Sequence, residues 1–244
     1  MRGFGDPGFF GERYAHEYDL TDWLDPAPAV EFLAGLVPGG GRVLELAAGT
    51  GRVAIPLAGR GVAVEGIEGS AAMAERMRAK PGGASIPVTI GDMADVAVTG
   101  PFRLAYLVYN TLFNLPSQER QVDCFRNVAK VLDPGGLFVI ECFIQDLTEF
   151  DRGQRVATRA LSEDSVEMEF LIHDPVAQAV TYQRVSFDAR GTTLRPLRLR
   201  YCWPSELDLM AQLAGLRLRD RYSDWDRSPF TAASHSHVSV YQRA

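Results

Sequence analysis

The sequence predicts an α/β protein built on a doubly wound, mostly parallel β-sheet, and three observations support this fold class. Between Arg42 and Phe143, short apolar runs rich in β-forming residues alternate with segments of helical spacing. After Phe143 this alternation stops, and side-chain character changes with a period near two. With 244 residues and 46% hydrophobic content, the chain can build one substantial core. We therefore expect one large domain that carries an antiparallel insertion.

Turn signals and apolar runs define the elements of the first half. A first helix is expected over 27–37, because Pro38 and the glycines at 39–41 follow it. The apolar runs predict five strands, at 42–47, 62–67, 86–91, 103–109 and 137–143. The segments between them predict helices at 52–59, 70–79 and 118–132. Residues 133–136, with the sequence DPGG, predict a stop and a turn before the fifth strand.

The second half predicts a β cap followed by a return to the sheet. The insertion from about Val156 to Trp203 is long for a connection and has the alternation of antiparallel strands. Helical spacing returns after it, with Ser205 as a candidate N-cap and Gly215 as a stop. The runs 216–225 and 237–243 can complete the sheet as a hairpin. The expected division is therefore 1–144 for an N-terminal lid and ligand-binding core, 145–203 for the cap, and 204–244 for the end of the core.

Composition narrows the class of protein. A formal charge of −6 without a dense basic block argues against a nucleic-acid binder. Cys124, Cys142 and Cys202 are far apart and lack metal-ligand spacing, so we interpret them as buried reduced thiols and expect no metal. The sequence has no signal-like segment and no apolar run of membrane-spanning length. These features predict a cytoplasmic protein without a membrane partner, and a homodimer is a further expectation.

The sequence VLELAAGTGRVAIPLA, from Val43 to Ala58, contains a small-residue turn between a strand and a helix. Glycines at 49 and 51 permit close approach of a flat ligand to the backbone. The run from Gly49 to Ala54 also satisfies the G-x-G-x-x-A fingerprint of dinucleotide sites, with Glu68 about 20 residues further on, where an acid meets a ribose diol. The turn alone therefore fits either a dinucleotide or another nucleoside.

Two acidic positions favour a nucleoside without a pyrophosphate. Glu45 precedes the turn, where a carboxylate would repel a pyrophosphate but attract an ammonium group. Asp92 follows the third apolar run, where it can accept from an exocyclic amine while the Met93 N–H donates to a ring nitrogen. Both lie at strand carboxyl ends, where open α/β sheets bind their ligands.

These residues resemble those of class I S-adenosylmethionine-dependent methyltransferases, in the branch that acts on natural products and amino sugars. The resemblance rests on ELAAGTGR, VEGIEGS, GDM and LDPGGLFVIECF, and it covers about Tyr14 to Phe143. It implies a Rossmann-like, seven-stranded fold with the cap inserted after the fifth strand, and S-adenosylmethionine as cofactor with S-adenosylhomocysteine as product. It also implies the cofactor-binding residues: Glu45, Ala47, Gly49 and Gly51 around the methionine part, Glu68 at the ribose hydroxyls, and Asp92 with Met93 at the adenine. Arg52, Gly69 and Tyr109 complete the expected cofactor-binding set.

The segment from Tyr14 to Asp19 resembles the Y-x-x-x-Y-D lid of small-molecule members of that family. Tyr14 and Tyr18 would then fold over the cofactor, because aromatic faces favour a nearby sulfonium and closure removes water. The alternative is that these two tyrosines share a helical face and simply pack on the domain.

The acceptor is expected where the fourth strand ends. Tyr109 and Asn110 begin the loop YNTLFNLPSQ and can line the point of methyl transfer. Asn110 can equally cap a turn there. If a general base is used, His235 is the first choice, since the last hairpin can bring it near the fourth strand. We therefore take His235, Tyr109 and Asn110 as candidate catalytic residues.

The leading interpretation is a methyltransferase that transfers a methyl group to nitrogen or oxygen of a small secondary metabolite by in-line displacement, driven by positioning and desolvation. The first alternative is an NAD(P)-dependent oxidoreductase, supported by the G-x-G-x-x-A run and Glu68. The second is a non-catalytic cofactor-binding partner protein.

Overall fold

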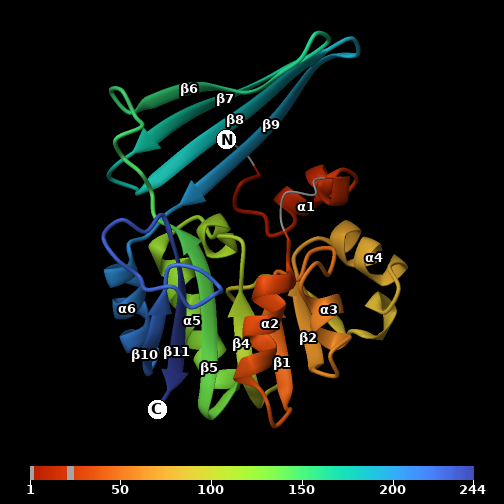
Figure 1. The fold of residues 1–244 in the computed structure, drawn as a ribbon, viewed down its shortest axis with the longest axis vertical. Coiled ribbons are helices and arrows are strands. Elements are labelled where there is room, and N and C mark those ends of the chain that lie inside the picture. Colours follow the sequence, from red (N-terminus) through yellow and green to blue (C-terminus); the bar gives the residue numbers. More distant parts are fainter. Residues whose placement is uncertain (1–2, 21–24) are drawn as a thin grey trace.

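The core of the protein is a seven-stranded, mostly parallel sheet, as the sequence predicts (Figure 1). The computed structural model describes residues 3–20 and 25–244. The strands follow the order β10-β11-β5-β4-β1-β2-β3, and β11 alone runs in the direction opposite to the other six strands. Their bounds are β1 Arg42–Leu46, β2 Ala63–Glu68, β3 Val88–Ile90, β4 Phe102–Leu107, β5 Leu132–Phe143, β10 Leu216–Tyr222 and β11 Ser236–Arg243. The strand order reverses between β1 and β4, and open α/β sheets form their ligand crevice at such a point.

Helices cover both faces of this sheet and bury two apolar cores. One face carries α2 and α3, while α5 and α6 pack on the other (Figure 1). The helices span α2 Ala27–Leu36, α3 Ala54–Ala58, α4 Ala71–Ala79, α5 Gln118–Val131 and α6 Pro204–Leu213. On α5 the apolar stripe includes Phe125, whose ring lies edge-on to Phe138 and Tyr241 at centroid distances of 5.3 and 5.7 Å. This packing fixes the strands that carry the site.

Two local expectations are corrected. Helix α6 begins at Pro204 with Trp203 as the N-cap, so Ser205 does not cap it. Proline suits the first helical position because its missing N–H would have no partner there and its φ is preset. The turn expected at residues 133–136 is instead an irregularity inside β5: Leu132 already pairs with Phe102, and regular pairing resumes at Leu137.

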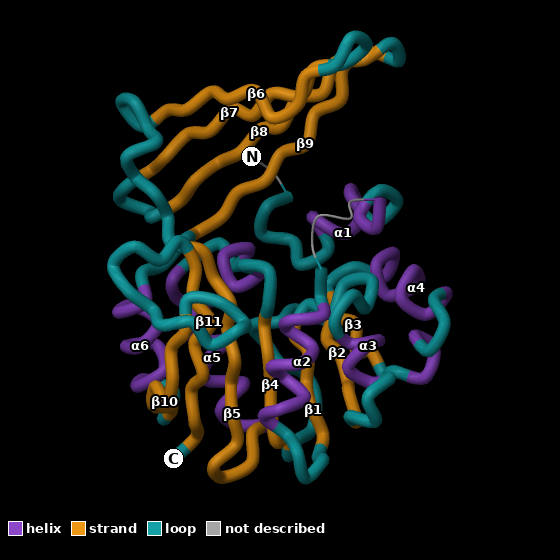
Figure 2. The backbone as a smooth tube through the Cα atoms, viewed as in Figure 1, coloured by secondary structure: helices purple, strands orange, loops and turns teal. Residues whose placement is uncertain are grey.

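A separate four-stranded antiparallel sheet forms the cap above the carboxyl edge of the core sheet (Figures 1 and 2). Its strands, in the order β6-β7-β8-β9, are β6 Gln154–Leu161, β7 Val166–Asp174, β8 Ala179–Asp188 and β9 Gly191–Arg200. Leu171, Val180 and Leu199 lie on its inner face and belong to the same buried cluster as the core. The outer face exposes Phe170 and Ile172. The predicted antiparallel cap after the fifth strand is thus confirmed.

The N-terminal segment lies between the cap and the core (Figure 2). It contains helix α1, Phe9–Tyr14, and the short 3-10 helix Tyr18–Leu20. α1 packs on α4, and the Ser70 hydroxyl donates to the Glu12 carboxylate at 2.9 Å. This placement puts the predicted lid beside the junction of β2 and α4.

The three cysteines are buried and unbonded, and burial raises the pKa of each thiol. Over residues 3–20 and 25–244, no group of three or more metal-ligating side chains comes together. Within the same described ranges, every helix is too short or too polar to cross a membrane.

Candidate functional site

The glycine turn between β1 and α3 is fixed by a buried carboxylate from the next strand. Ala47 and Gly49 both have left-handed backbone conformations, with φ of 55° and 57°. The Gly49 N–H donates to Glu68 Oε2 at 2.7 Å, and the Ser70 N–H donates to Oε1 at 2.8 Å. Each oxygen keeps a second lone pair that can accept from a ligand hydroxyl. Burial raises the pKa of Glu68. Because two backbone N–H groups bind its carboxylate, the backbone sets the position of this group before any ligand arrives.

Two other glycines assigned to the cofactor have a packing reason. Gly51 has φ of 78°, and a Cβ there would lie 2.7 Å from Met77 Cγ. A Cβ on Gly69 would lie 2.3 Å from the carbonyl oxygen of Pro7. Gly51 therefore allows the turn to pack on α4, and Gly69 allows the N-terminal segment to approach the end of β2.

Three buried polar atoms near this turn lack hydrogen-bond partners among the described residues. They are Glu45 Oε2 and the hydroxyl oxygens of Tyr106 and Tyr109. Glu45 and Tyr106 face each other on the neighbouring strands β1 and β4. Burial raises the pKa of Glu45 to about 8 and that of Tyr109 to about 12. Buried polar groups are normally paired, so this cluster has the chemistry to hold a cationic, hydrogen-bonding ligand such as an amino-acid ammonium group.

Asp92, the predicted adenine residue, is already held in place by the protein. Its Oδ1 accepts from the Ala94 N–H at 2.8 Å, and its Oδ2 accepts from Arg120 at 2.9 Å. Met93 is partly buried against the core. Because each carboxylate oxygen can accept twice, Asp92 can still receive an exocyclic amine. Arg120 on α5 was not anticipated from the sequence, because it is 28 residues away from Asp92.

The N-terminal segment is bonded to the glycine turn. The Arg52 guanidinium lies 5.0 Å from the centroid of the Tyr18 ring and donates to the Tyr18 carbonyl at 3.1 Å. The Asp19 carboxylate accepts from the Thr50 hydroxyl at 2.7 Å and from Lys80 at 2.9 Å. The segment is therefore held directly over the turn, which is the position that the lid resemblance implies for Tyr18.

The same segment is also bonded to the cap. The Tyr14 hydroxyl donates to the Pro196 carbonyl on β9 at 2.9 Å. Glu17 accepts two hydrogen bonds from Arg195, also on β9. Tyr14 is thus buried against the cap, and neither residue was predicted to make this link.

Tyr109 and Asn110 lie at the end of β4 in left-handed conformations, with φ of 55° and 63°. The side-chain Oδ1 of Asn110 accepts from the Phe143 N–H, which ties the exits of β4 and β5 together. Glu141 accepts from the Tyr109 N–H at 2.7 Å and from the Trp225 indole at 3.0 Å. Asn110 and Glu141 therefore shape this edge, and the Tyr109 hydroxyl is the polar group left for a ligand.

The candidate base His235 lies on the surface. The backbone carbonyl of His235 accepts from the Ile144 N–H at 2.7 Å, which fixes its backbone beside the end of β5. The residue as a whole is exposed to solvent. His237 is fully buried, contacts Ser239 at 2.9 Å, and burial lowers its pKa to about 4. His235 is the histidine of this pair that can exchange protons with solvent.

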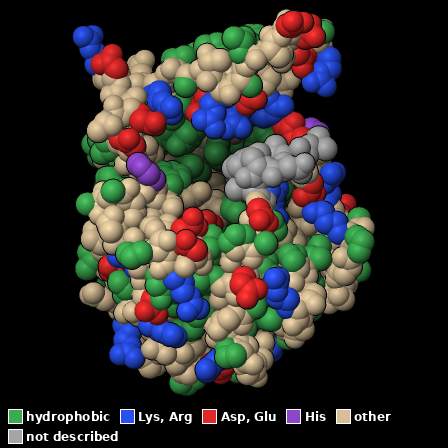
Figure 3. Space-filling model, viewed as in Figure 1, with side chains coloured by type: hydrophobic (Ala, Val, Ile, Leu, Met, Phe, Trp, Pro, Cys, Tyr) green, Lys and Arg blue, Asp and Glu red, His purple; other side chains and the backbone are tan. Residues whose placement is uncertain are grey.

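A hollow separates the cap from the core, and hydrophobic side chains are visible inside it (Figure 3). Apolar side chains packed at this junction come from both parts: Phe143 and Phe150 from the core side, and Tyr182 and Leu197 from the cap. The N-terminal segment lies at one side of the hollow. A small molecule entering it would meet an apolar roof and the end of β4.

Tyr106 and Trp225 were also missed by sequence reasoning. Tyr106 lies inside an apolar run, where an aromatic residue indicates core packing, and nothing in the sequence indicates that its hydroxyl faces Glu45. Trp225 lies 84 residues from Glu141, its partner. Only the tertiary structure brings these groups to the site.

Comparisons with known proteins agree with this geometry. Residues 43–136 match the family described as a methyltransferase domain. The structure of the CcbJ methyltransferase from Streptomyces caelestis is 37% identical, covers 99% of this chain and 98% of its own, and superposes with a TM-score of 0.88. A cypemycin N-terminal methyltransferase from a Streptomyces species is 28% identical over 98% of this chain and 99% of its own length. The fold is shared with S-adenosylmethionine-bound CalS10 from Micromonospora echinaspora. That structure is 18% identical, covers 96% of both chains and superposes with a TM-score of 0.71.

The oxidoreductase alternative gains no support from these similarities. The unpartnered atoms at Glu45, Tyr106 and Tyr109 fit the ammonium-bearing part of S-adenosylmethionine, and the Glu68 carboxylate fits its ribose diol. The Glu45 carboxyl, which burial keeps largely protonated, offers a pyrophosphate no cationic partner, whereas an ammonium group favours its ionised form.

Proposed function

Because the chain belongs to the S-adenosylmethionine-dependent methyltransferases, as its similarity to CcbJ over nearly the whole of both chains shows, we propose that it methylates an amine nitrogen of a small natural product. A hydroxyl oxygen is the second candidate acceptor. A cytoplasmic location and a homodimer remain predictions.

The observation that carries this proposal is the arrangement of lid, cap and core around an apolar hollow (Figure 3). The cap shares a buried cluster with the core, and the N-terminal segment is bonded to both. A hollow bounded in this way suits a small acceptor better than an extended surface of a macromolecule. We therefore place the acceptor beneath the cap, against Phe143, Tyr182 and Leu197.

Bound S-adenosylmethionine supplies a methyl group on a sulfonium, which is already activated for in-line displacement. The protein then has to orient the acceptor and exclude water. Glu45 and Glu68 would hold the cofactor at its end of this arrangement. The Arg52 guanidinium lies 5.0 Å from the centroid of the Tyr18 ring and 6.0 Å from that of the Tyr109 ring. The cap and lid keep bulk water from the transfer point.

The groups at the end of β4 favour a nitrogen atom over an oxygen atom as the methyl acceptor. A hydroxyl acceptor needs a base to remove its proton, whereas a neutral amine can attack first and lose its proton afterwards. Both Glu141 oxygens already accept hydrogen bonds, and the pKa of Tyr109 is raised to about 12. Among the described residues at this edge, His235 is the remaining candidate base, and it lies at the surface. The name of the cypemycin relative also indicates an amine acceptor.

A panel of small primary and secondary amines, each paired with its hydroxyl analogue, tests this proposal. The purified protein is incubated with S-adenosylmethionine, and the products are analysed by mass spectrometry with fragmentation to locate the new methyl group. We expect methylated amines and unchanged hydroxyl analogues. Methylation of the hydroxyl analogues with the amines untouched would overturn the nitrogen assignment, and it would assign the base to His235 or to a residue outside the described ranges.

A further inference from the structure

A cavity of about 450 Å³ lies between the N-terminal segment and the cap, and its wall is rich in positive charge. The N-terminal side contributes Arg13, His16 and Glu17, and the cap contributes Arg190, Thr193 and Arg195. Pockets of this volume commonly hold small ligands. The charged and titratable groups of the wall are thus three guanidinium groups, one histidine and one carboxylate. Figure 3 shows Lys and Arg side chains gathered on the side of the cap that faces the core.

Arg195 is held rigidly in this wall. Its Nε and Nη2 donate to the Glu17 carboxylate at 2.7 and 3.0 Å, and its Nη1 donates to the Ser186 hydroxyl at 2.8 Å. A guanidinium fixed by three hydrogen bonds presents its remaining N–H groups in a set direction. The Arg195 side chain therefore loses little further conformational entropy when a ligand binds.

The other cations leave a surplus of positive charge. Arg190 pairs with Asp188, with a shortest distance of 2.6 Å, and Glu17 offsets Arg195. Arg13 lies 4.7 Å from the centroid of the Phe9 ring and makes no ion pair with another described residue. With these two pairs made, Arg13 gives the wall a surplus of one positive charge, which an anion in the cavity would balance. The chemistry of the wall thus selects an anion.

The cap face leading to this cavity changes from apolar to charged. Along β9, Leu199 and Leu197 lie on the same inner face as Arg195, because side chains two residues apart share a face. On β8, Val180 and Tyr182 are followed in the same way by Arg184, whose charge is offset by Glu167 and Glu169 at 3.1 and 3.4 Å. At roughly 3.3 Å per residue, Arg195 lies about 7 Å beyond Leu197 along the strand. A molecule lying under the cap would meet apolar side chains near the core and the Arg195 guanidinium at its outer end.

We propose that this cavity is a subsite for an anionic group of the acceptor, a carboxylate or a phosphate ester, on the side away from the methylated nitrogen. This inference rests on the proposed function, because it takes the acceptor to lie beneath the cap. Arg195 orients the anion. Arg13, from the lid, and Arg190, from the β8–β9 turn, contact it from the other sides.

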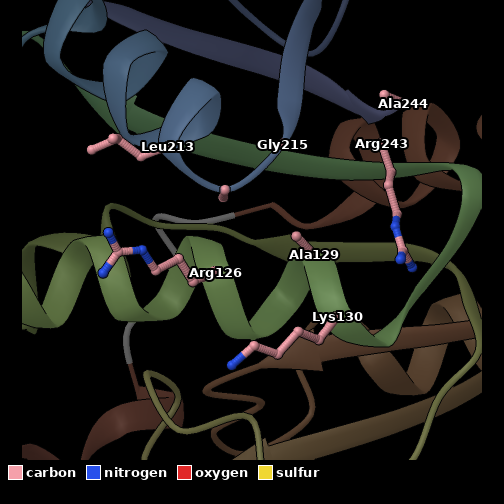
Figure 4. Close-up of a pocket in the computed structure, with 8 residues that line it drawn as sticks. Arg126, Ala129, Lys130, Leu213, Gly215, Arg243 and Ala244 are labelled. Carbon is pink, nitrogen blue, oxygen red and sulfur yellow. The ribbon is translucent and has the colours of Figure 1, made fainter.

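A second basic hollow provides a matched control. It has a volume of about 420 Å³ and is lined by Arg126, Lys130 and Arg243 near the C-terminus. There the Arg243 guanidinium is bonded to the Leu132 carbonyl, and Figure 4 shows the charged ends of Arg126, Lys130 and Arg243 at separate places around the hollow. Its cations do not converge, so removing two of them changes net charge without removing an anion subsite.

The test is a calorimetric titration of the protein saturated with S-adenosylhomocysteine, at constant ionic strength. One arm uses phenyl phosphate and the other uses benzoate, so that the tighter probe distinguishes a phosphate ester from a carboxylate. The double variant Arg13→Gln/Arg190→Gln is compared with the control Arg126→Gln/Lys130→Gln. We expect the wild type and the control to bind one anion alike, and the first variant to bind at least about tenfold more weakly.

Failure to bind either probe would overturn the subsite, as would wild-type affinity in Arg13→Gln/Arg190→Gln or an equal loss in the control. The preceding titration with S-adenosylhomocysteine separates this failure from failure of the proposed function. Normal binding of that product with no anion binding rejects the subsite alone, whereas no binding of the product rejects the function on which the subsite rests.

Discussion

Glu17 and Arg195 join the N-terminal segment to the cap through two hydrogen bonds of 2.7 and 3.0 Å between carboxylate and guanidinium. Two residues later, Asp19 is bonded to Thr50 in the glycine turn. One short segment therefore holds both the roof of the acceptor hollow and the cofactor turn. Any change that frees this segment should act on both.

The variant Glu17→Gln should weaken binding of S-adenosylhomocysteine by about 3- to 10-fold. It replaces a charge-assisted pair, partly shielded from solvent, with a weaker contact, and the expected loss is about 1 kcal/mol. The matched control is Glu65→Gln, which breaks the similar pair of Glu65 with Arg42 at the start of β1. Calorimetry should show an unchanged affinity in the control. Equal losses in both variants would mean that the lid contact has no special role.

The variant Glu68→Ala should weaken cofactor binding by about 1–3 kcal/mol, or roughly 5- to 150-fold. The change removes the acceptor for the ribose diol and leaves the Gly49 and Ser70 N–H groups without the carboxylate that accepts from them. Circular dichroism should confirm that the variant is folded. A folded variant with wild-type affinity for S-adenosylhomocysteine would contradict the ribose assignment.

Asp92→Ala should weaken cofactor binding by about 1–3 kcal/mol through loss of the adenine contact. Arg120→Gln removes the partner of Asp92 but leaves its carboxylate, so we expect little change in affinity and a lower melting temperature. If both variants lose the same affinity for S-adenosylhomocysteine, the ion pair and not an adenine contact explains the effect.

Binding of the cofactor near pH 7 should release close to one proton. The pKa of Glu45 is raised to about 8 by burial, so its carboxyl is mostly protonated in the free protein, and an arriving ammonium group favours the ionised form. Affinity should therefore increase as the pH rises towards 8 and then level off. Calorimetry in buffers of different ionisation enthalpy measures the proton count. The variant Glu45→Gln should release no proton, and proton release that persists in it would assign the effect elsewhere.

His235→Gln should leave binding of S-adenosylhomocysteine unchanged and alter transfer to an amine by less than about twofold, because the attacking amine needs no base. The rate of transfer as a function of pH is the informative measurement. A pH dependence of the rate that is present in the wild type and absent from the variant would identify His235 as the base and favour a hydroxyl acceptor.

The sequence allowed prediction of the sheet and the cap, because apolar runs and residue alternation are local properties. It also located Glu45, Glu68 and Asp92 at strand ends. The contacts of Glu17 with Arg195 and of Trp225 with Glu141 join residues 178 and 84 positions apart, and no local pattern encodes such pairs. Likewise, a glycine such as Gly69 resembles a ligand-binding position in the sequence, although its neighbour in the structure is Pro7.

The most direct test of the central claim is a calorimetric titration of the wild-type protein with S-adenosylhomocysteine, in parallel with NAD and NADP. We expect tight binding of S-adenosylhomocysteine at one site and no binding of either dinucleotide. Binding of NAD or NADP in its place would contradict the assignment of the cofactor site, since it would mean that the glycine turn accepts a pyrophosphate beside Glu45.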